Sequence, residues 1–422
     1  MRARAEAPPY SMDLERHRPR IDEWVDDHRE DCIAFLQDLI AIPSATTVGE
    51  DEAEIADRVV EELEALDYDE VRVDGIGNVH GVIEGARDDE GAVMLNSHID
   101  TVGFGDREHW DHDPYGGEIE DGQLYGLGSA DMLCAMASMI YGGAALIDLD
   151  ITPEHDVYVT GEVFEEVHEG HAMRYVVEKA GLDLSAVVIG EATEMNVKRG
   201  HRGRCELKIE IEGASCHASA PERGINPLYH AAAMLERIEE LNEETADDDF
   251  LGSGTIAGTN LEVDTPSNNA VPAHATLYVD RRLTVGEDEA TVHAELEDAI
   301  GAAEAVHGED VAADVETLSF DRPSYTGYQQ ETPKYYPSWV LDEDHPLVQQ
   351  TSEVVSTMLD SGHEITKWTF STSGNYTMGV AGIPTIGFGP SREGWAHMAN
   401  ERVAVEDVVD AIGVYAGLAA EL

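Results

Sequence analysis

A histidine and an aspartate stand two residues apart at the end of an apolar segment, and both side chains can bind metal ions or move protons. The segment reads VMLNSHID and ends in His98 and Asp100. Its apolar start favours a buried parallel strand, and side chains alternate along a strand, so both residues face the same side. The histidine could bind a metal directly while the aspartate orients it. A solvent-facing pair is the alternative, because this spacing alone is a weak signal.

Acidic residues follow two further strand-like segments, 157–160 and 186–189. Ligands of open α/β sheets bind at the carboxyl ends of the strands, so acids placed there are predicted to converge on His98. One such carboxylate is expected by chance in an acidic chain, but three successive strands that each end in acid or imidazole are not. The candidates, with the aspartate before a predicted helix and a histidine in a late loop, are Glu162, Glu165, Glu166, Glu191, Asp131 and His397.

The charge of the chain is extreme. Its 422 residues include 87 Asp and Glu against 26 Lys and Arg, a formal net charge of −61. The acids are spread through all segments, which indicates adaptation to molar salt, where a Debye length of about 3 Å screens self-repulsion. We therefore expect a halophilic protein. Such a surface repels nucleic acid and anionic lipid, so neither is an expected partner.

The cysteines and the N-terminal segment bear on the compartment. The four cysteines lie far apart and form no C-x-x-C pair, which favours a reducing cytoplasm. The first 20 residues contain arginines but no apolar segment of the signal-peptide kind, and no segment has membrane-spanning length. We expect a cytoplasmic protein with residues 1–20 disordered, and translation could begin at Met1 or Met12.

Hydrophobic periodicity predicts an α/β protein in two parts. The first is a catalytic domain, residues 21–201 and 321–422, with a mixed, mostly parallel sheet flanked by helices. The second, residues 202–320, is an inserted domain with the α+β pattern of two helices on an antiparallel sheet. A long loop, 103–128, is predicted to lie near the site. Helices are predicted over 21–40, 55–66, 132–147, 227–241, 287–302 and 346–359, and strands over 71–73, 79–83, 93–97, 157–160, 186–189, 205–211, 255–256, 274–279 and 385–388.

Several motifs, in order along nearly the whole chain, resemble those of one enzyme family. They are SHIDTV, YGLGSADM, EVFEE, IGEAT, CHASAPERGINP and AHMANE. The family is that of the zinc aminoacylases and carboxypeptidases, which includes acetylornithine deacetylase, succinyl-diaminopimelate desuccinylase and carboxypeptidase G. TPSNNAVP, VDRRLTVGE, KWTFST and GIPTIGFGP are most similar to its selenium-metabolism-linked hydrolase subgroup.

The resemblance implies two Zn²⁺ ions per subunit, for which Co²⁺ is a possible substitute. It assigns His98, Asp131 and Glu191 to one ion, and Asp131, Glu166 and His397 to the other. Carboxylate oxygens and imidazole nitrogens suit zinc, and three protein ligands leave a position open for water. Asp100 becomes the orienting partner of His98, and Glu165 the general base. A solvated helix start is the alternative interpretation of two adjacent glutamates.

In the inserted domain, by the same resemblance a lid and dimerisation domain, three residues act on substrate. His217 crosses into the partner subunit of a homodimer to stabilise the oxyanion, Arg282 holds the substrate carboxylate, and Asn269 binds substrate. Arginine suits a carboxylate because its planar fork binds both oxygens, although an arginine on an amphipathic strand is as readily structural. Gly374 lines the substrate pocket. Four further histidines, set aside because they match no family ligand, are His109, His112, His168 and His171.

The chain departs from the family at two positions. Arg and Lys commonly surround the bridging aspartate, but Leu127 and Leu133 stand there in this chain. Neither position binds metal, so the departure concerns substrate preference. We expect a hydrolase that cleaves an amide bond of a carboxylate-bearing N-acyl-amino acid or small peptide. The alternatives are a dipeptidase or carboxypeptidase, a cyclic-amide hydrolase, and a non-catalytic metal-binding or ligand-binding relative.

Overall fold

The computed structural model describes residues 14–87, 91–308 and 311–422, and these form two compact units. Unit 1 contains the described residues up to Gly200 together with Pro323–Gln329 and Leu341–Leu422. Unit 2 contains His201–Arg322, without its two undescribed residues, and Gln330–Val340. The inserted segment predicted over 202–320 lies in unit 2. Residues 323–337, which are rich in Pro and Tyr and which we assigned to the catalytic domain, are divided between the two units.

A mixed sheet forms the centre of unit 1 and confirms the predicted fold class. Its strands, in spatial order, are β1 (Glu70–Val73), β2 (Val79–Ile83), β6 (Val157–Glu162), β3 (Ala92–His98), β7 (Leu184–Ile189), β21 (Thr385–Gly387), β8 (Val197–Lys198) and β20 (Ile365–Thr366). The four strands β6, β3, β7 and β21 run parallel, and β1, β2 and β8 introduce antiparallel pairs. Strand β3 is buried throughout, as its apolar start requires.

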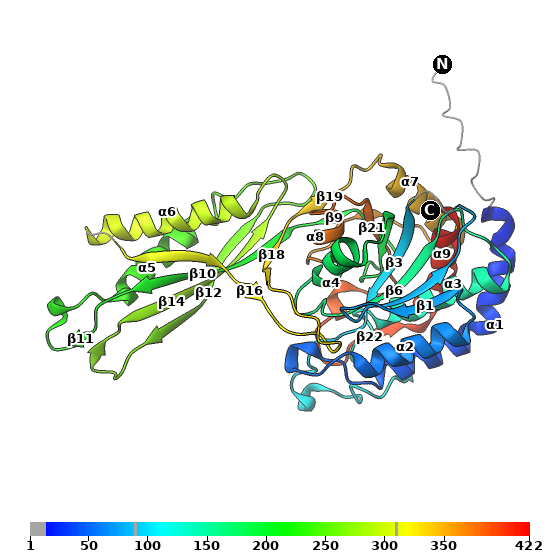
Figure 1. Cartoon of the computed structure of the whole chain (residues 1–422), viewed down its shortest axis with the longest axis horizontal. Helices are drawn as coiled ribbons and strands as arrows, with labels where there is room; N and C mark the ends of the chain where they lie inside the picture. Colours follow the sequence, from blue (N-terminus) through cyan, green and yellow to red (C-terminus); the bar gives the residue numbers. More distant parts are fainter. Residues whose placement is uncertain (1–13, 88–90, 309–310) are drawn as a thin grey trace, which may run out of the picture. The chain divides into compact units, whose positions relative to one another are not determined.

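Helices cover the sheet because their apolar faces need a partner. Helix α3 is buried along nearly its whole length and packs against α1 and α9, with the three side by side in Figure 1. Close approach of α3 to α9 depends on Gly142, where an added Cβ would meet Ala416 backbone at 3.0 Å. The helices of unit 1 are α1 (Leu14–Ile40), α2 (Ala53–Ala65), α3 (Leu133–Asp148), α4 (His171–Tyr175), α7 (Pro346–Met358), α8 (Gly374–Thr377) and α9 (Val405–Glu421).

The N-terminal prediction needs a correction. Helix α1 begins at Leu14, so residues 14–20 are helical although we expected the first 20 residues to be disordered. Leu14 is buried on this helix, as are Ile21, Trp24 and Val25. The helix therefore begins before residue 21 and includes the polar residues 15–20, whose composition we had interpreted as disorder. Residues 1–13, with both candidate start methionines, lie outside the described residues.

The long loop after β3 contains structure of its own. Strands β4 (Glu118–Glu120) and β5 (Gln123–Tyr125) form a hairpin whose turn residues, Asp121 and Gly122, have φ of 50° and 76°. A positive φ at both positions is what an Asp-Gly turn provides. Strand β5 also pairs with β22 (Arg402–Ala404), which follows the loop of His397. The predicted position of this loop near the site is therefore borne out by its pairing.

Unit 2 has the predicted α+β pattern. Its main sheet has the order β12-β14-β10-β15, and helices α5 and α6 pack on each other and against the sheet. Burial alternates along β10 and β14, as expected when one face of a sheet is covered by helices. The principal elements are β10 (Gly203–Glu212), α5 (Pro227–Leu241), β12 (Thr255–Asp264), β14 (His274–Leu283), α6 (Glu289–His307) and β15 (Ala313–Thr317).

Two elements of unit 2 differ from the sequence expectation. Strand β12 has ten residues, whereas only 255–256 were predicted, and β15 was missed. Most of β12 is exposed at the edge of the sheet, so its residues lack the buried alternation that identifies a strand. The remaining short strands of the chain are β9 (Gly200–His201), β11 (Cys216–His217), β13 (Ala270–Val271), β16 (Ser319–Phe320), β17 (Thr332–Pro333), β18 (Tyr335–Tyr336) and β19 (Trp339–Val340).

None of the described helices combines the length and the apolar character that a membrane crossing requires.

Candidate functional site

The site forms at one edge of the sheet of unit 1. Strands β6, β3 and β7 are parallel neighbours, so their carboxyl ends meet there. His98 is the last residue of β3 and pairs with Glu162 at the end of β6. Glu191 follows β7 by two residues. The convergence that we predicted from three strand ends therefore occurs.

Asp131 lies between two imidazoles that come from opposite ends of the sequence. Its Oδ1 is 3.1 Å from Nε2 of His98, and its Oδ2 is 3.1 Å from Nε2 of His397. Asp131 precedes α3, whereas His397 lies in a late loop with a left-handed φ of 57°. One carboxylate thus presents a different oxygen to each histidine, which is the geometry of a ligand shared by two metal ions.

The other predicted ligands lie beside these two histidines. Glu166 Oε2 is 3.1 Å from His397 Nε2, and Glu191 Oε1 is 3.7 Å from His98 Nε2. Among the described residues, two groups have ligand atoms within 4.8 Å of one another: His98, Asp131 and Glu166; and His98, Glu165 and Glu191. Glu165 is therefore as close to a metal position as the residues that we predicted to be ligands, and distance alone does not separate its role from theirs.

The carboxylates of the site are buried, and some of their oxygens lack a hydrogen-bond partner. Oε1 of Glu165 and Oε2 of Glu191 have no hydrogen-bond partner among the described residues. Burial, with repulsion from Asp131, raises the pKa of Glu191 well above its usual range and that of Glu166 to about 7. Burial also raises the pKa of Glu165 far above its usual range. The protein alone does not supply enough positive charge for these acids.

The excess of carboxylates in the site also raises the pKa values of its two histidines. Hydrogen bonds to Asp131 and Glu166 raise the pKa of His397 to about 11. Burial lowers the pKa of His98, but the bond to Asp131 and the charges of Glu165 and Glu191 raise it well above its usual range. Buried carboxylates with orphan oxygens, next to imidazole nitrogens, are the donor set that divalent zinc prefers. These residues therefore fit a pair of divalent metal ions.

Four consecutive backbone amides hold the two adjacent glutamates in place. The N–H groups of residues 163–166 each donate to a side chain from another part of unit 1. Phe164, in the middle, has a left-handed φ of 65°, which is uncommon for a residue with a large side chain. The acceptors, in order, are Asn78 Oδ1 at 3.1 Å, Glu52 Oε1 at 3.0 Å, and the two carboxylate oxygens of Asp100, each at 3.2 Å.

Asp100 contributes to the site differently from the expectation. The ring Nδ1 of His98 lies 2.8 Å from the backbone carbonyl of Asp100 and 3.6 Å from its carboxylate. The carboxylate accepts the amides of Glu165 and Glu166, and Thr46 Oγ1 donates to it at 2.6 Å. Asp100 therefore orients the histidine through its main chain and orients the two glutamates through its side chain.

Glu401 is a further buried acid that the sequence reasoning did not single out. Its Oε1 accepts the amides of Ala130 at 2.8 Å and Asp131 at 3.1 Å. Glu401 follows His397 by four residues, so one short segment carries a histidine of the site and fixes the backbone of the shared aspartate. It ends the AHMANE motif, which was the available signal. Glu52 offered none in so acidic a sequence, and neither did Asn78, a single amide residue between two predicted strands.

A comparison with known families now assigns the chain. The model of peptidase family M20/M25/M40 matches residues 94–421, which include every candidate site residue. This chain belongs to that family. It is therefore a metallohydrolase of the peptidase and deacylase kind, as the resemblance of its motifs predicted.

Individual M20 relatives agree with the assignment. The chain is 38% identical over 411 residues to the uncharacterized protein YgeY of Escherichia coli (strain K12), with 97% of each chain covered. It is 31% identical over 260 residues to succinyl-diaminopimelate desuccinylase of Rhodospirillum centenum, which covers 58% of this chain and 66% of the relative.

Solved M20-type structures share the fold. Aminopeptidase PepT of Bacillus cereus has a TM-score of 0.70 at 20% identity, with 93% of this chain and 98% of that chain covered. The YXEP protein of Bacillus subtilis, a dinuclear metal-binding peptidase of family M20, has a TM-score of 0.67 at 17% identity and covers 94% and 98%. At such identities the likeness concerns the fold.

The hydrogen bond from the backbone N–H of Phe164 to the Glu52 carboxylate leads to a first prediction for this M20 chain. Burial, with the charge of Asp100, raises the pKa of Glu52 to about 8, so the group is largely neutral at pH 7. Glu52→Ala removes the acceptor of a buried N–H, and we expect kcat to fall about 10- to 100-fold with little change in KM. Glu52→Gln keeps an acceptor oxygen of the same reach and should restore most of kcat. Steady-state kinetics at pH 7 distinguish the two variants, and equal losses in both would refute the positioning role.

Gly374, a predicted pocket residue, is buried at the start of α8. The preceding Ser373 donates to Glu162 Oε1 at 2.7 Å and accepts the amide of Gly170 at 3.0 Å. These bonds tie the Gly374 turn to the strand end that carries the site glutamates. Gly374 therefore follows directly on this connection, within unit 1.

In unit 2, His217 and Asn269 are neighbours. His217 pairs with Ala270 across the β11–β13 ladder, and the amide of Ala218 donates to the carbonyl of Asn269 at 2.9 Å. The His217 ring is exposed, and its Nδ1 lies 2.7 Å from Ser219 Oγ. The Nε2 atom of this histidine is thus directed by a local contact at Nδ1.

Arg282 lies on β14 of the main sheet of unit 2, at the end of that strand far from β13. It pairs with Arg204 on β10, whereas His274, at the end of β14 nearest β13, pairs with Glu212. Eight residues of strand separate Arg282 from His274, which is about 26 Å. Its neighbour Arg281 is fully buried between Glu287 and Glu295, while the Arg282 side chain is 32% exposed. Of the two arginines, Arg282 is the one that a substrate could reach.

The four histidines that we set aside have separate environments. His112 contacts Glu118 at 2.9 Å near the surface, and the rings of His168 and His171 pack 5.5 Å apart. Burial lowers the pKa of His171 to about 4. His109 lines a pocket beside His397. Within the described residues, none of these four belongs to a group with metal-binding geometry.

Proposed function

We propose that this protein is a di-zinc hydrolase that cleaves an amide bond in an N-acyl-amino acid or small peptide. The observation that carries the proposal is the Asp131 carboxylate, whose two oxygens each lie 3.1 Å from a different histidine. A buried aspartate shared in this way is what two adjacent metal positions require. The assigned family, M20/M25/M40, is consistent with such a site.

In this proposal, two sets of protein ligands hold the ions. His98 and Glu191 would hold one ion, His397 and Glu166 would hold the other, and Asp131 would offer one carboxylate oxygen to each. Zn²⁺ is the proposed metal, with Co²⁺ as a substitute, because the donors are imidazole nitrogens and carboxylate oxygens. Bound there, the metals supply a more acidic water and polarise the scissile carbonyl.

Glu165 is the proposed general base. The Asp100 carboxylate accepts the backbone N–H of Glu165 and so fixes the backbone from which this side chain enters the site. Oε1 of Glu165 has no competing hydrogen bond among the described residues. Burial holds its pKa high, which suits a group that accepts a proton from water and returns it to the leaving nitrogen. Its neighbour Glu166, bonded to His397, is not free for this task.

We further propose a homodimer in which His217 stabilises the oxyanion in the partner's site, with Asn269 beside it as a substrate-binding residue, while Arg282 binds the substrate carboxylate. The support is that His217 is exposed and that unit 2, as described, contains no group with metal-binding geometry, so its histidine must serve a site elsewhere. Mixing His217→Ala subunits with Glu165→Gln subunits should restore up to half of wild-type activity. If verified heterodimers stayed inactive, His217 would not act in trans.

The substrate is proposed to be a small molecule. Two alternative activities of the same general kind, amide hydrolysis, can be tested against the proposed one. A dipeptidase or carboxypeptidase would favour free dipeptides, and a cyclic-amide hydrolase would open a ring. A non-catalytic relative would bind metal without turnover, but the intact Glu165 argues against it. A nucleic-acid or membrane partner is not proposed, because the net charge of −61 repels both.

One experiment tests the proposed activity. The purified protein is assayed in molar KCl against N-acetyl-amino acids, N-succinyl-amino acids and dipeptides, before and after chelation. We expect hydrolysis of at least one class, its loss on chelation, and its return with Zn²⁺ or Co²⁺. Full activity in a preparation with no measurable metal would contradict the metal mechanism, and no hydrolysis with two ions bound would favour the non-catalytic relative.

The proposed setting is the cytoplasm of a halophile. The protein should need a high salt concentration to remain folded, because salt screens the repulsion among its 87 acidic residues. The melting temperature should rise between dilute buffer and molar KCl, and a constant value would argue against halophilic adaptation.

A further inference from the structure

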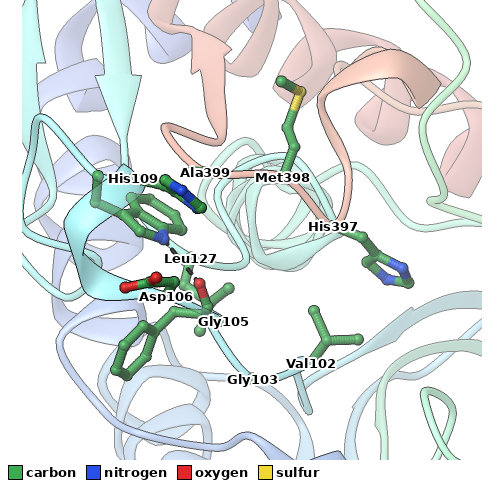
Figure 2. A pocket seen from close by; sticks show the side chains of 11 residues that line it. Val102, Gly103, Gly105, Asp106, His109, Leu127, His397, Met398 and Ala399 are labelled. Atoms are coloured by element: carbon green, nitrogen blue, oxygen red, sulfur yellow. Dashed lines mark hydrogen bonds between the residues drawn. The ribbon is translucent and has the colours of Figure 1, made fainter.

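A pocket of about 190 Å³ lies beside the metal ligand His397 in unit 1, and we call it the His397 pocket. Figure 2 shows His397 and Met398 on one side of it, with Val102 and Leu127 among the residues that line it. His397 also lies 3.1 Å from both Asp131 and Glu166. Whatever fills the pocket therefore lies next to the proposed site of amide cleavage.

Apolar side chains line one part of the pocket, and Asp106, His109 and His397 line the rest together with glycine and alanine. Val102, Phe104, Trp110, Leu127 and Met398 line it. Trp110 and Leu127 are almost fully buried, at 5% and 3% exposure. The indole N–H of Trp110 donates to the carbonyl of Phe104 at 2.8 Å, so it is engaged within the wall. The pocket thus offers an apolar surface on which the indole N–H of Trp110 is not a free donor.

The charged groups of the pocket do not favour an anion. Its lining residues, all of them described, include the Asp106 carboxylate, the imidazoles of His109 and His397, and no lysine or arginine. As a ligand of the proposed metal, His397 would be neutral. Leu127 occupies the position where the sequence comparison leads us to expect an arginine. The positive charge of bound metal would be largely offset by Asp131, Glu166 and Glu191. A substrate carboxylate in this pocket would face Asp106 without a dedicated counter-ion.

We infer that the His397 pocket binds an uncharged, apolar group next to the scissile amide, and that Leu127 and Met398 determine this preference. The inference rests on the proposed amide hydrolysis and narrows it. The apolar group is either the acyl chain or the side chain of the amine, and substrates in which each is varied separately distinguish the two. N-succinyl substrates are expected to be poor.

The kinetic test uses the zinc-loaded protein in molar KCl at a single pH. The acyl series is N-acetyl-, N-butanoyl-, N-hexanoyl- and N-succinylglycine, and the amine series is N-acetylglycine, N-acetylalanine and N-acetylleucine. We expect kcat/KM to rise about fourfold per added methylene in one series. N-succinylglycine should fall below N-butanoylglycine. A preference for the succinyl substrate, or no dependence on chain length in either series, would overturn the inference.

Variants separate the pocket from general effects. Met398 is 46% exposed, so Met398→Lys should fold and should lower the hexanoyl-to-succinyl ratio of kcat/KM about tenfold. Leu127→Arg should act in the same direction but alters a buried position. Val380→Lys makes the same change in charge at a 52% exposed residue outside the pocket and should leave the ratio unchanged. An unchanged ratio in Met398→Lys would exclude the pocket.

A binding measurement keeps the inference separate from the proposed function. Calorimetric titration of the metal-loaded Glu165→Gln variant with N-hexanoylglycine, N-acetylleucine and N-succinylglycine needs no turnover. Tighter binding of one apolar ligand, weakened by Met398→Lys, supports the pocket even if no amide is hydrolysed. Equal or tighter binding of the succinyl ligand refutes it even if hydrolysis is confirmed.

Discussion

Glu165→Gln is expected to lower kcat by about 10²- to 10⁴-fold while two divalent ions stay bound. Glutamine has the same shape but cannot accept a proton, and a positioned general base contributes about this much to rate. The amide of residue 165 would still donate to Asp100 at 3.2 Å, so the local backbone should keep its course. Turnover and metal content, measured on the same preparation in molar salt, test the prediction.

The matched control is Glu166→Gln, the same change one residue away. Glu166 contacts His397, so this variant should weaken the binding of one ion and lose turnover as a consequence. The structure also permits the opposite assignment, because Glu165 forms a metal-compatible group with His98 and Glu191. If Glu165→Gln lost an ion but retained full turnover per bound ion, Glu165 would be the ligand and the base would have to be sought elsewhere.

Asp131→Ala is expected to abolish hydrolysis and to weaken both metal sites together. Its two oxygens are the contacts that His98 and His397 share, so no other single residue of the site touches both histidines at 3.1 Å. Equilibrium dialysis against Zn²⁺ should give fewer than one ion per subunit at concentrations that saturate the wild type.

Glu191→Gln provides the comparison for Asp131→Ala. It removes charge from the His98 side alone and should leave the ion beside His397 and Glu166 in place. Loss of a single ion in Asp131→Ala, with the second still tightly bound, would show that the aspartate is not shared. Loss of both ions in Glu191→Gln would show instead that the two positions bind cooperatively.

The types and order of the site residues were predictable from sequence. The chemistry of His98, Glu166 and Glu191 is local: each follows a short strand whose apolar composition requires burial, and parallel strands bring their carboxyl ends to one edge. The α+β pattern of the inserted segment was likewise evident from periodicity. The extent of β12 was not, because an exposed edge strand has no apolar alternation.

Only the tertiary structure decided how these residues act together. That each oxygen of Asp131 meets a different histidine depends on a loop near residue 131 and another near residue 397 meeting in space. The Asp100 carboxylate was expected to orient His98, but it holds the amides of Glu165 and Glu166, because the backbone at Phe164 takes a left-handed turn beside it.

The residues most hidden from sequence analysis are Glu52, Asn78 and Glu401. Each is a buried acceptor for a backbone N–H of a loop distant in sequence, and of the three only Glu401, which ends the AHMANE motif, carried a signal in the sequence. Leu127 illustrates the converse. Sequence alone identified it as a departure that bears on substrate preference, and the structure gave that departure a physical meaning by placing it in the wall of the His397 pocket. Residue types thus determined the chemistry that is available, and long-range packing determined which atoms share it.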